Sequence, residues 1–469
     1  MRIVNATPLA KYRPGFQTGE MERYFLPRAL LPDGWARDVL LTVADGTVTA
    51  LHSGAAAGNA VRLSGVALPG MPNLHSHAFQ RGMAGLAQRG GDFWSWREVM
   101  YRFQAALAPD DIEAIAAIAY MEMLEAGFTA VAEFHYVHHA PDGTAYANPA
   151  ELSARIAAAA ETSGIGLTML PVFYAHGSFN AMPPTPGQRR FVNDIDSYAR
   201  LLDGTARAIA ALPDAQLGIA PHSLRAATIP ELGQLVQLAA GRVLHIHIAE
   251  QTLEVDDCLA ATGQRPVEHL LANIAVDHRW CLVHATHMTV AETTALAATG
   301  AVAGLCPITE ADLGDGVFPA IAWREASGRF GIGTDSNTAI SATQELRLLE
   351  YSQRLQHRTR NLLAPSGISS GRYLWDQAVG GGTQALNRPV GAIAPGRRAD
   401  FVVIDPAHPA LLGRDEDTLL DAVTFAAATP CITDVVAGGR HVVRDGRHVA
   451  RDAILSAYQR TAHRLVDTI

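Results

Sequence analysis

The chain has 469 residues, 48% of them hydrophobic, so it is long enough for a large globular core with a smaller domain beside it. A net charge of −9 and a pI near 6.1 give no basic surface for nucleic acid. No run of about 18 apolar residues is present, the N-terminus lacks the apolar stretch of a signal peptide, and the four cysteines form no CxxC pair. We therefore expect a cytoplasmic protein without nucleic-acid or membrane partners.

Both ends of the chain carry short β-type runs separated by turn pairs. Residues 36–54 contain apolar runs on either side of an Asp-Gly turn, and residues 432–449 repeat this pattern. We expect residues 1–67 and 386–469 to pair into one small, discontinuous β-sandwich that ends in a helix.

The middle of the chain, residues 68–385, alternates short apolar runs with Ala- and Leu-rich helical segments. Regular alternation of strand and helix predicts a parallel sheet, and eight such units fit a closed (β/α)8 barrel whose active site lies at the carboxyl ends of its strands. We expect this barrel to be the catalytic domain. The predicted strands lie within residues 68–79, 129–137, 165–174, 215–223, 241–250, 279–287, 300–309 and 329–336.

The first of these strands ends in His75-Ser76-His77. Residues two apart on a strand point to the same side, so both imidazoles face one point. Imidazole is a good ligand for zinc or iron. At a barrel strand end, this pair predicts half of a divalent-metal site rather than two unrelated loop residues.

The fifth strand carries His245 and His247, with Glu250 three residues further on. His247 lies nearer the strand's end and is the expected third ligand, whereas His245 is expected to be a buried, hydrogen-bonded residue. Glu250, just past the strand, is placed to transfer protons without binding the ion.

The last strand is followed by Asp335 in the segment GTDS. An Asp there could instead cap the following helix, but three histidines at other strand ends favour a fourth metal ligand that also accepts a proton. The sixth strand ends with His284, which we expect to orient or polarise the water or the substrate, while His287 is expected to be structural.

Another group of histidines, in the segment FHYVHH, is spaced irregularly and runs into a loop-like sequence. We expect these residues to be solvent-exposed or to belong to a substrate loop, rather than to bind the metal. They are His135, His138 and His139.

These elements resemble the amidohydrolase superfamily over nearly the whole chain, through HSH, HIHIAE, LVHATH, GTDS and the flanking segments GAIAPGRRADFVVID and VVAGGRHVVRDG. Two-metal sites of this scaffold commonly use a carboxylated barrel lysine. The only lysine here is Lys11, outside the barrel. The resemblance therefore implies the mononuclear deaminase branch, with one divalent ion, Zn²⁺ or else Fe²⁺, that activates water.

Within that branch, NLHSHAFQRGMAGL, DFWSWREVMYRF and APHSLRA most resemble the formimidoylglutamate deiminases of bacterial histidine degradation. The resemblance implies conversion of N-formimino-L-glutamate and water to N-formyl-L-glutamate and ammonia. In this reaction Asp335 and His284 would hold or take the water's proton. Glu250 would pass a proton to the departing nitrogen, because an amide anion is a poor leaving group.

A substrate with two carboxylates calls for arginine forks, which bind carboxylate through two hydrogen bonds. Arg225, after a strand end, and Arg102, in the loop after the first strand, are the candidates, with Arg81 and Arg89 behind them. Other expected substrate contacts are Gln80, Tyr136 and His222.

Two other functions remain open. The first is a mononuclear deaminase for a nucleobase, nucleoside or guanidine-like compound, which would share the metal site and differ only in the pocket. The second is a scaffold that has lost catalysis, although this chain keeps all four ligands and Glu250. Barrels of this kind are often homodimers, and we expect one here.

Overall fold

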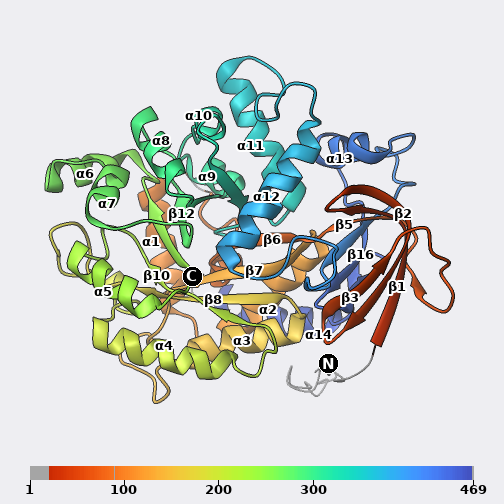
Figure 1. Cartoon of the computed structure of the whole chain (residues 1–469). Helices are drawn as coiled ribbons and strands as arrows, with labels where there is room; N and C mark the ends of the chain where they lie inside the picture. Colours follow the sequence, from red (N-terminus) through yellow and green to blue (C-terminus); the bar gives the residue numbers. More distant parts are fainter. Residues whose placement is uncertain (1–20, 89, 467–469) are drawn as a thin grey trace.

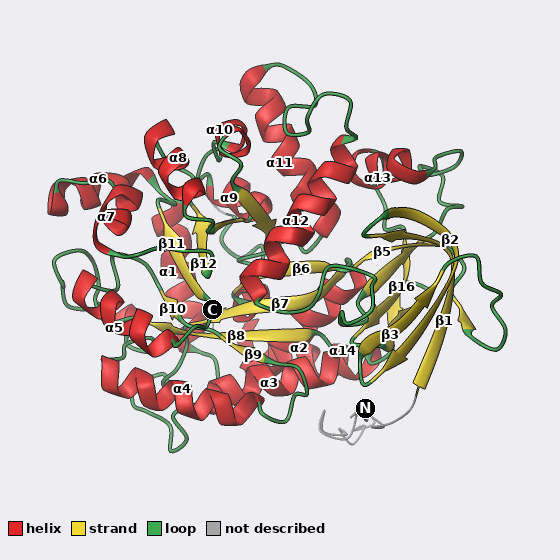
Figure 2. Cartoon of the chain, viewed as in Figure 1, coloured by secondary structure: helices red, strands yellow, loops and turns green. Residues whose placement is uncertain are grey.

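The computed structural model describes residues 21–88 and 90–466, so Lys11 and Arg89 lie outside the described residues. Its larger part is a barrel of eight parallel strands surrounded by helices (Figures 1 and 2). The fourth strand is made of two short pieces, β9 and β10. The strands are β6 (Met71–Ser76), β7 (Phe128–His135), β8 (Gly166–Phe173), β9 (Gln216–Leu217), β10 (Ala220–Pro221), β11 (Leu244–Ile248), β12 (Trp280–His284), β13 (Val302–Leu305) and β14 (Arg329–Ile332).

Two main-chain bridges close the barrel. Strands β6 to β10 form one parallel sheet and β11 to β14 another. A parallel bridge between Ile219 and Leu244 joins the two sheets at one seam, and a parallel bridge between Ser76 and Asp335 joins them at the other. The (β/α)8 prediction is therefore confirmed, and the second seam places the loop after β14 directly beside the end of β6.

Helices cover the outside of the barrel, and several begin where the sequence supplies a cap. Thr228 and Thr289 accept a hydrogen bond from the backbone N–H three residues on and form capping boxes at α5 and α8. The barrel helices are α2 (Pro109–Glu125), α3 (Glu151–Ser163), α4 (Ile195–Ile209), α5 (Ile229–Ala239), α6 (Thr252–Thr262), α7 (Pro266–Asn273), α8 (Val290–Ala298), α9 (Pro307–Leu313), α10 (Ala320–Glu325), α11 (Ala342–His357) and α12 (Ser370–Leu386).

Three further helices lie in loops near the site. The short 3-10 helix η2 (Ala78–Met83) and helix α1 (Phe93–Ala105) fill the connection between β6 and α2, and η3 (Pro186–Gln188) precedes α4. Asp92 caps α1 by accepting hydrogen bonds from the backbone N–H groups of Trp94 and Ser95.

Strands from both ends of the chain form one nine-stranded sheet beside the barrel (Figure 1). Its two faces alternate along the strands, as β geometry requires. In β15, Val402 packs into the barrel-side core, whereas Phe401 and Val403 pack into a second core. The strands are β1 (Met21–Leu31), β2 (Gly34–Ala44), β3 (Thr47–His52), β4 (Val61–Arg62), β5 (Val66–Pro69), β15 (Phe401–Ile404), β16 (Ile432–Ala437), β17 (Arg440–Arg444) and β18 (Arg447–His448).

Two helices accompany this sheet, α13 (Glu416–Phe425) and α14 (Arg451–Val466), which packs against α2. We propose that the domains divide at residues 67/68 and 385/386, inside β5 and at the last turn of α12. Among the described residues, no helix combines the length and apolar character needed to cross a membrane.

Candidate active site

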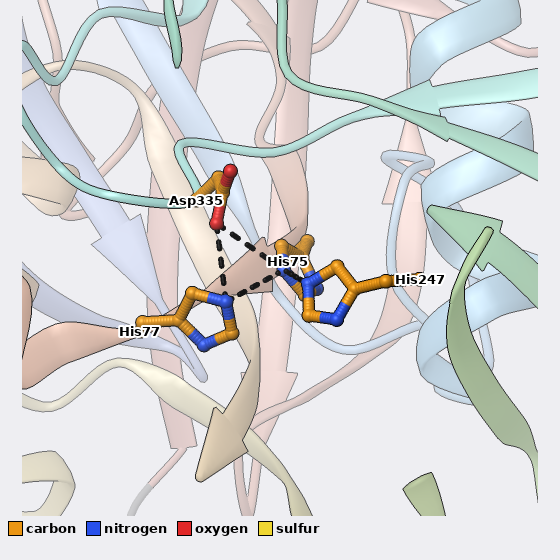
Figure 3. Close-up of side chains that lie close together, drawn as sticks. All are labelled: His75, His77, His247 and Asp335. Atoms are coloured by element: carbon orange, nitrogen blue, oxygen red, sulfur yellow. Dashed lines mark hydrogen bonds and ion pairs between the residues drawn. The ribbon is translucent and has the colours of Figure 1, made fainter. Parts of the chain in front are cut away.

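Four side chains at the carboxyl ends of barrel strands converge on one point (Figure 3). The Nε2 atom of His75 lies 3.2 Å from Nε2 of His77 and 3.0 Å from Nε2 of His247. Oδ1 of Asp335 lies 3.2 Å from Nε2 of His77 and 3.4 Å from Nε2 of His75. All four residues are buried, and one ligand atom of each lies within 4.8 Å of the others. The structure thus brings together the four residues that the sequence assigned to a metal ion.

The backbone holds this cluster in place. Strand β6 and the loop after β14 pair directly, because the N–H groups of Thr334 and Asp335 donate to the carbonyl of His75 at 3.0 Å. In return the N–H of His77 donates to the carbonyl of Asp335 at 2.9 Å. The backbone therefore fixes His75 and His77, on the first barrel strand, in position beside Asp335, which follows the last strand.

The protonation of the imidazoles fits a bound cation. His77 Nδ1 donates to the carbonyl of Phe134 at 2.8 Å, and His247 Nδ1 donates to the carbonyl of His222 at 3.1 Å. Both Nε2 atoms then present lone pairs to the cluster. Burial lowers the pKa of His75 to about 3 and that of His247 well below its usual value, so the rings are neutral. Neutral imidazoles and a carboxylate that face one point in this way form a binding site for a divalent metal ion.

Glu250 and His284 lie beside the cluster and line the cavity that opens over it. His284 Nε2 lies 3.7 Å from Glu250 Oε1 and 3.7 Å from Asp335 Oδ2, while its Nδ1 lies 3.3 Å from Glu310 Oε1. Burial raises the pKa of Glu250. Burial also opposes a charge on His284, but three surrounding carboxylates, led by Glu250, outweigh it and raise the pKa of His284 to about 10. Glu250 and His284 can therefore hold and exchange protons next to the metal-binding cluster.

The strand ends that carry these residues have a strained backbone. Ala249, His284 and Asp335 have φ values of 51°, 68° and 43°, in the left-handed region that non-glycine residues seldom adopt. Glu254 stabilises the turn at Ala249, because its carboxylate accepts the N–H groups of Ala249 at 3.2 Å and Glu250 at 3.1 Å. This contribution of Glu254 was not predicted from the sequence.

A cavity opens over the cluster, and four of the five predicted substrate residues line it, namely Gln80, Tyr136, His222 and Arg225. Gln80 Nε2 donates to the Tyr136 hydroxyl at 2.6 Å. Burial, followed by the charge of Arg225, lowers the pKa of His222 well below its usual value. The remaining walls are mostly aromatic and aliphatic and comprise Phe93, Trp96, Met100, Tyr101, Tyr174, Phe191 and Leu313.

The fifth predicted substrate residue, Arg102, does not reach the cavity. It is exposed on α1, and Arg97 of the same helix lines the cavity instead. Five helical positions correspond to a rotation of about 500°, so the two side chains point in different directions. The helical spacing could have shown this, because Arg97 shares a face with Phe93 and Met100, at i, i+4 and i+7.

Two guanidinium groups therefore face the cavity. Arg225 Nη2 lies 3.9 Å from Glu250 Oε2, and its Nε atom has no hydrogen-bond partner among the described residues. Arg97 lies over the ring of Trp94, 4.2 Å from its centroid, and Nε of Arg97 likewise lacks a hydrogen-bond partner within the described part of the chain. Arg81 instead forms an ion pair with Glu122, 2.6 Å away, and does not line this cavity.

His245 and His287 form hydrogen bonds to backbone carbonyls and lie outside the metal-binding cluster. His245 Nε2 donates to the carbonyl of Ala385 at 2.9 Å, and His287 Nε2 donates to that of Asp315 at 2.7 Å. The expected exposure of the FHYVHH group is wrong for two of its members. His135, the last residue of β7, is 1% exposed, and His138, whose N–H donates to the carbonyl of Arg190 at 2.8 Å, is 2% exposed. The alternative, a place in a substrate loop, stays a prediction.

Fold and cluster together define a (β/α)8 barrel with a metal-binding site at the carboxyl ends of its strands. Residues 66–442 match the model of the amidohydrolase family, and residues 24–64 match that of the N-terminal domain of formimidoylglutamate deiminase HutF. The chain belongs to the amidohydrolase family, as the resemblance seen in the sequence predicted.

Individual relatives agree with this assignment. The chain is 51% identical over 456 residues to a formimidoylglutamate deiminase of Pseudomonas aeruginosa, covering 95% of this chain and all of the relative. It is 26% identical to an 8-oxoguanine deaminase of the same species, covering 85% of this chain and 86% of the relative. A crystal structure of an amidohydrolase from Brucella melitensis superposes with a TM-score of 0.91 at 49% identity, covering 95% of this chain and all of that one.

Proposed function

We propose that this protein hydrolyses N-formimino-L-glutamate to N-formyl-L-glutamate and ammonia. The observation that supports this most strongly is the pair of guanidinium groups, Arg97 and Arg225, in the cavity that also contains the metal-binding cluster and Glu250. Two arginines suit a small substrate with two carboxylates. The 51% identity to a formimidoylglutamate deiminase over its full length supports the same substrate.

We propose zinc as the ion, held by His75, His77, His247 and Asp335, with iron as the alternative that the same ligands accept. When bound, such an ion lowers the pKa of water from about 15.7 toward about 7, so that hydroxide is available near neutral pH. The homodimer and the cytoplasmic location expected from the sequence remain predictions.

The chain's own residues would then handle the substrate and the protons. The two arginines bind the carboxylates and direct the formimino carbon toward the cluster, while Gln80, Tyr136 and His222 contact the rest of the substrate. Asp335 Oδ2 accepts the proton that water loses as its oxygen bonds to that carbon, while His284, which the surrounding carboxylates keep protonated, orients this water through Nε2, 3.7 Å from Asp335 Oδ2.

The carbon–nitrogen bond to the terminal nitrogen then breaks. Glu250 delivers the two protons of the water to this nitrogen in turn, one as the carbon–oxygen bond forms and one as the carbon–nitrogen bond breaks, so the nitrogen leaves as ammonia and the remaining carbon–oxygen unit becomes the formyl group. Since Glu250 contacts both Arg225 and His284, one carboxylate connects the binding and proton-transfer parts of the site.

The substrate is tested by ammonia release from purified metal-loaded protein with N-formimino-L-glutamate, guanine, cytosine and adenosine. We expect turnover of the first compound, with N-formyl-L-glutamate as the second product, and none above background for the others. Turnover of a nucleobase or nucleoside without turnover of N-formimino-L-glutamate would contradict the proposal. Inactivity toward the whole panel by protein that holds its metal would also contradict it.

The two arginines of α1 make a matched pair for a second prediction. Arg97→Ala removes a charged hydrogen-bond donor from the cavity and should lower kcat/KM by about 10- to 150-fold, corresponding to about 1.5–3 kcal/mol. Arg102→Ala removes an exposed charge from the same helix and should change kcat/KM less than about twofold. Steady-state kinetics on both variants measures the difference. Equal effects would show that the cavity arginine does not bind substrate.

A further inference from the structure

A second group of metal-ligand side chains lies beside the first. His284, Cys306 and Asp335 each offer one ligand atom within 4.8 Å of the others, and all three are buried. They follow or end β12, β13 and β14, which are neighbours in the sheet. The deimination mechanism makes no use of Cys306, which is 0% exposed.

Asp335 belongs to both groups, and its two oxygens point in different directions. Oδ1 lies 3.2 Å and 3.4 Å from the imidazoles of His77 and His75, whereas Oδ2 lies 3.7 Å from His284 Nε2. The Oδ2–Nε2 distance is too long for a hydrogen bond. A carboxylate in this position can bridge two ions, with one oxygen bound to each.

The orientation of His284 also suits a ligand. Its Nδ1 faces Glu310 Oε1 at 3.3 Å, so Nε2 is directed toward Asp335 and Cys306. A carboxylate behind the imidazole is the usual arrangement of a metal-binding histidine. Glu250 Oε1, 3.7 Å from the same Nε2, supplies a possible fourth ligand. Sulfur, imidazole and carboxylate are together a ligand set for zinc or a softer divalent ion.

The charge around this group favours a second cation. Besides Asp335 itself, four buried carboxyl groups interact with members of this group, whereas Arg225, whose side chain is 13% exposed, lies within ion-pair distance only of Glu250 among the described residues. These four are Glu250, Glu310, Asp315 and Glu345. Crowded carboxylates without enough cations repel one another, and an additional divalent ion reduces this repulsion.

We propose that excess zinc or cadmium binds at His284, Cys306 and Asp335 as a second ion and inhibits the enzyme. Binding converts the Cys306 thiol to a thiolate and removes the proton from His284 Nε2, and both protons are released to solvent. The ion then occupies Asp335 Oδ2, which accepts the water's proton in the proposed mechanism, and His284 Nε2, which orients that water. The inhibitory effect rests on that mechanism, whereas binding of the ion does not.

Cadmium titration of protein loaded with one zinc ion per chain tests the proposal, because cadmium thiolates have a charge-transfer absorption in the ultraviolet. None of the four residues of the first cluster carries sulfur, so the band reports binding to a cysteine, and cysteine variants identify which of the four free cysteines it is. We expect one additional cadmium ion per chain, a thiolate band, retained zinc, and loss of ammonia release over the same concentration range.

Cys306→Ser should abolish the band and raise the half-inhibiting cadmium concentration by at least about tenfold. Loss of a residue that only hydrogen-bonds to a metal ligand already lowers metal affinity by about 10- to 100-fold, and Cys306 is itself a proposed ligand. Cys431→Ser, at another buried cysteine, should behave as wild type. Cadmium binding to the wild type without a thiolate band would overturn the proposal, even if Cys306→Ser failed to fold. Equal inhibition of Cys306→Ser and wild type would also overturn it. The band needs no substrate, so it is independent of whether N-formimino-L-glutamate is turned over.

Discussion

Replacing Glu250 with Gln is expected to lower kcat by about 10²- to 10⁴-fold, the usual contribution of general acid–base catalysis. Glutamine has nearly the same shape but cannot exchange a proton. Since Glu250 is not one of the four residues of the metal-binding cluster, metal content should stay unchanged, and KM should change little. Steady-state ammonia release and metal analysis of the same preparation measure both effects.

Glu325→Gln is a suitable control, because the Glu325 side chain is 65% exposed and lies on α10, outside the cavity lining. It should retain wild-type kcat. Full activity of Glu250→Gln would show that Glu250 does not transfer protons in this reaction. Loss of the metal in that variant would instead indicate that Glu250 helps to hold the ion.

Replacing Arg225 with Met should lower kcat/KM by about 2–5 kcal/mol, or about 30- to 5,000-fold, chiefly through KM. The variant keeps much of the side-chain volume but leaves one substrate carboxylate without its buried partner. Arg102→Met, on an exposed side chain, provides the matched control and should change kcat/KM less than about twofold.

A substrate analogue that lacks one carboxylate separates binding from general disruption. If Arg225 binds the carboxylate that the analogue lacks, the analogue should be a poor substrate of the wild type and should lose little more in Arg225→Met. If Arg97 binds that carboxylate, Arg97→Ala should show this behaviour instead. Carboxylate recognition by these arginines would be contradicted if each variant lowered kcat/KM by the same factor for analogues lacking either carboxylate as for the full substrate.

The barrel could be predicted because its pattern is local. Each strand is a short apolar run and is followed within the same segment by a helix, so alternation alone predicts parallel strands. The pair His75 and His77 could be assigned from the two-residue period of a strand. Asp335 was the least local ligand, since its position next to β6 depends on closure of the barrel between Ser76 and Asp335.

The parts that sequence reasoning missed depend on rotation and on contacts across strands. Arg102 was proposed and Arg97 was overlooked because the segment was treated as a loop, whereas in the helix that forms there Arg97 lines the cavity and Arg102 does not. Cys306 showed no local ligand spacing, and its nearness to His284 arises from the pairing of β12 with β13. Glu254 gave no signal beyond a charge on a helix, although it holds the turn before Glu250.

Metal reconstitution tests the central claim, that one ion held by His75, His77, His247 and Asp335 supports catalysis. Protein freed of metal by a chelator is titrated with zinc while ammonia release from N-formimino-L-glutamate is measured. We predict no activity without metal, and a linear rise that breaks at one ion per chain. Activity in metal-free protein, or a break at two ions per chain, would contradict the account.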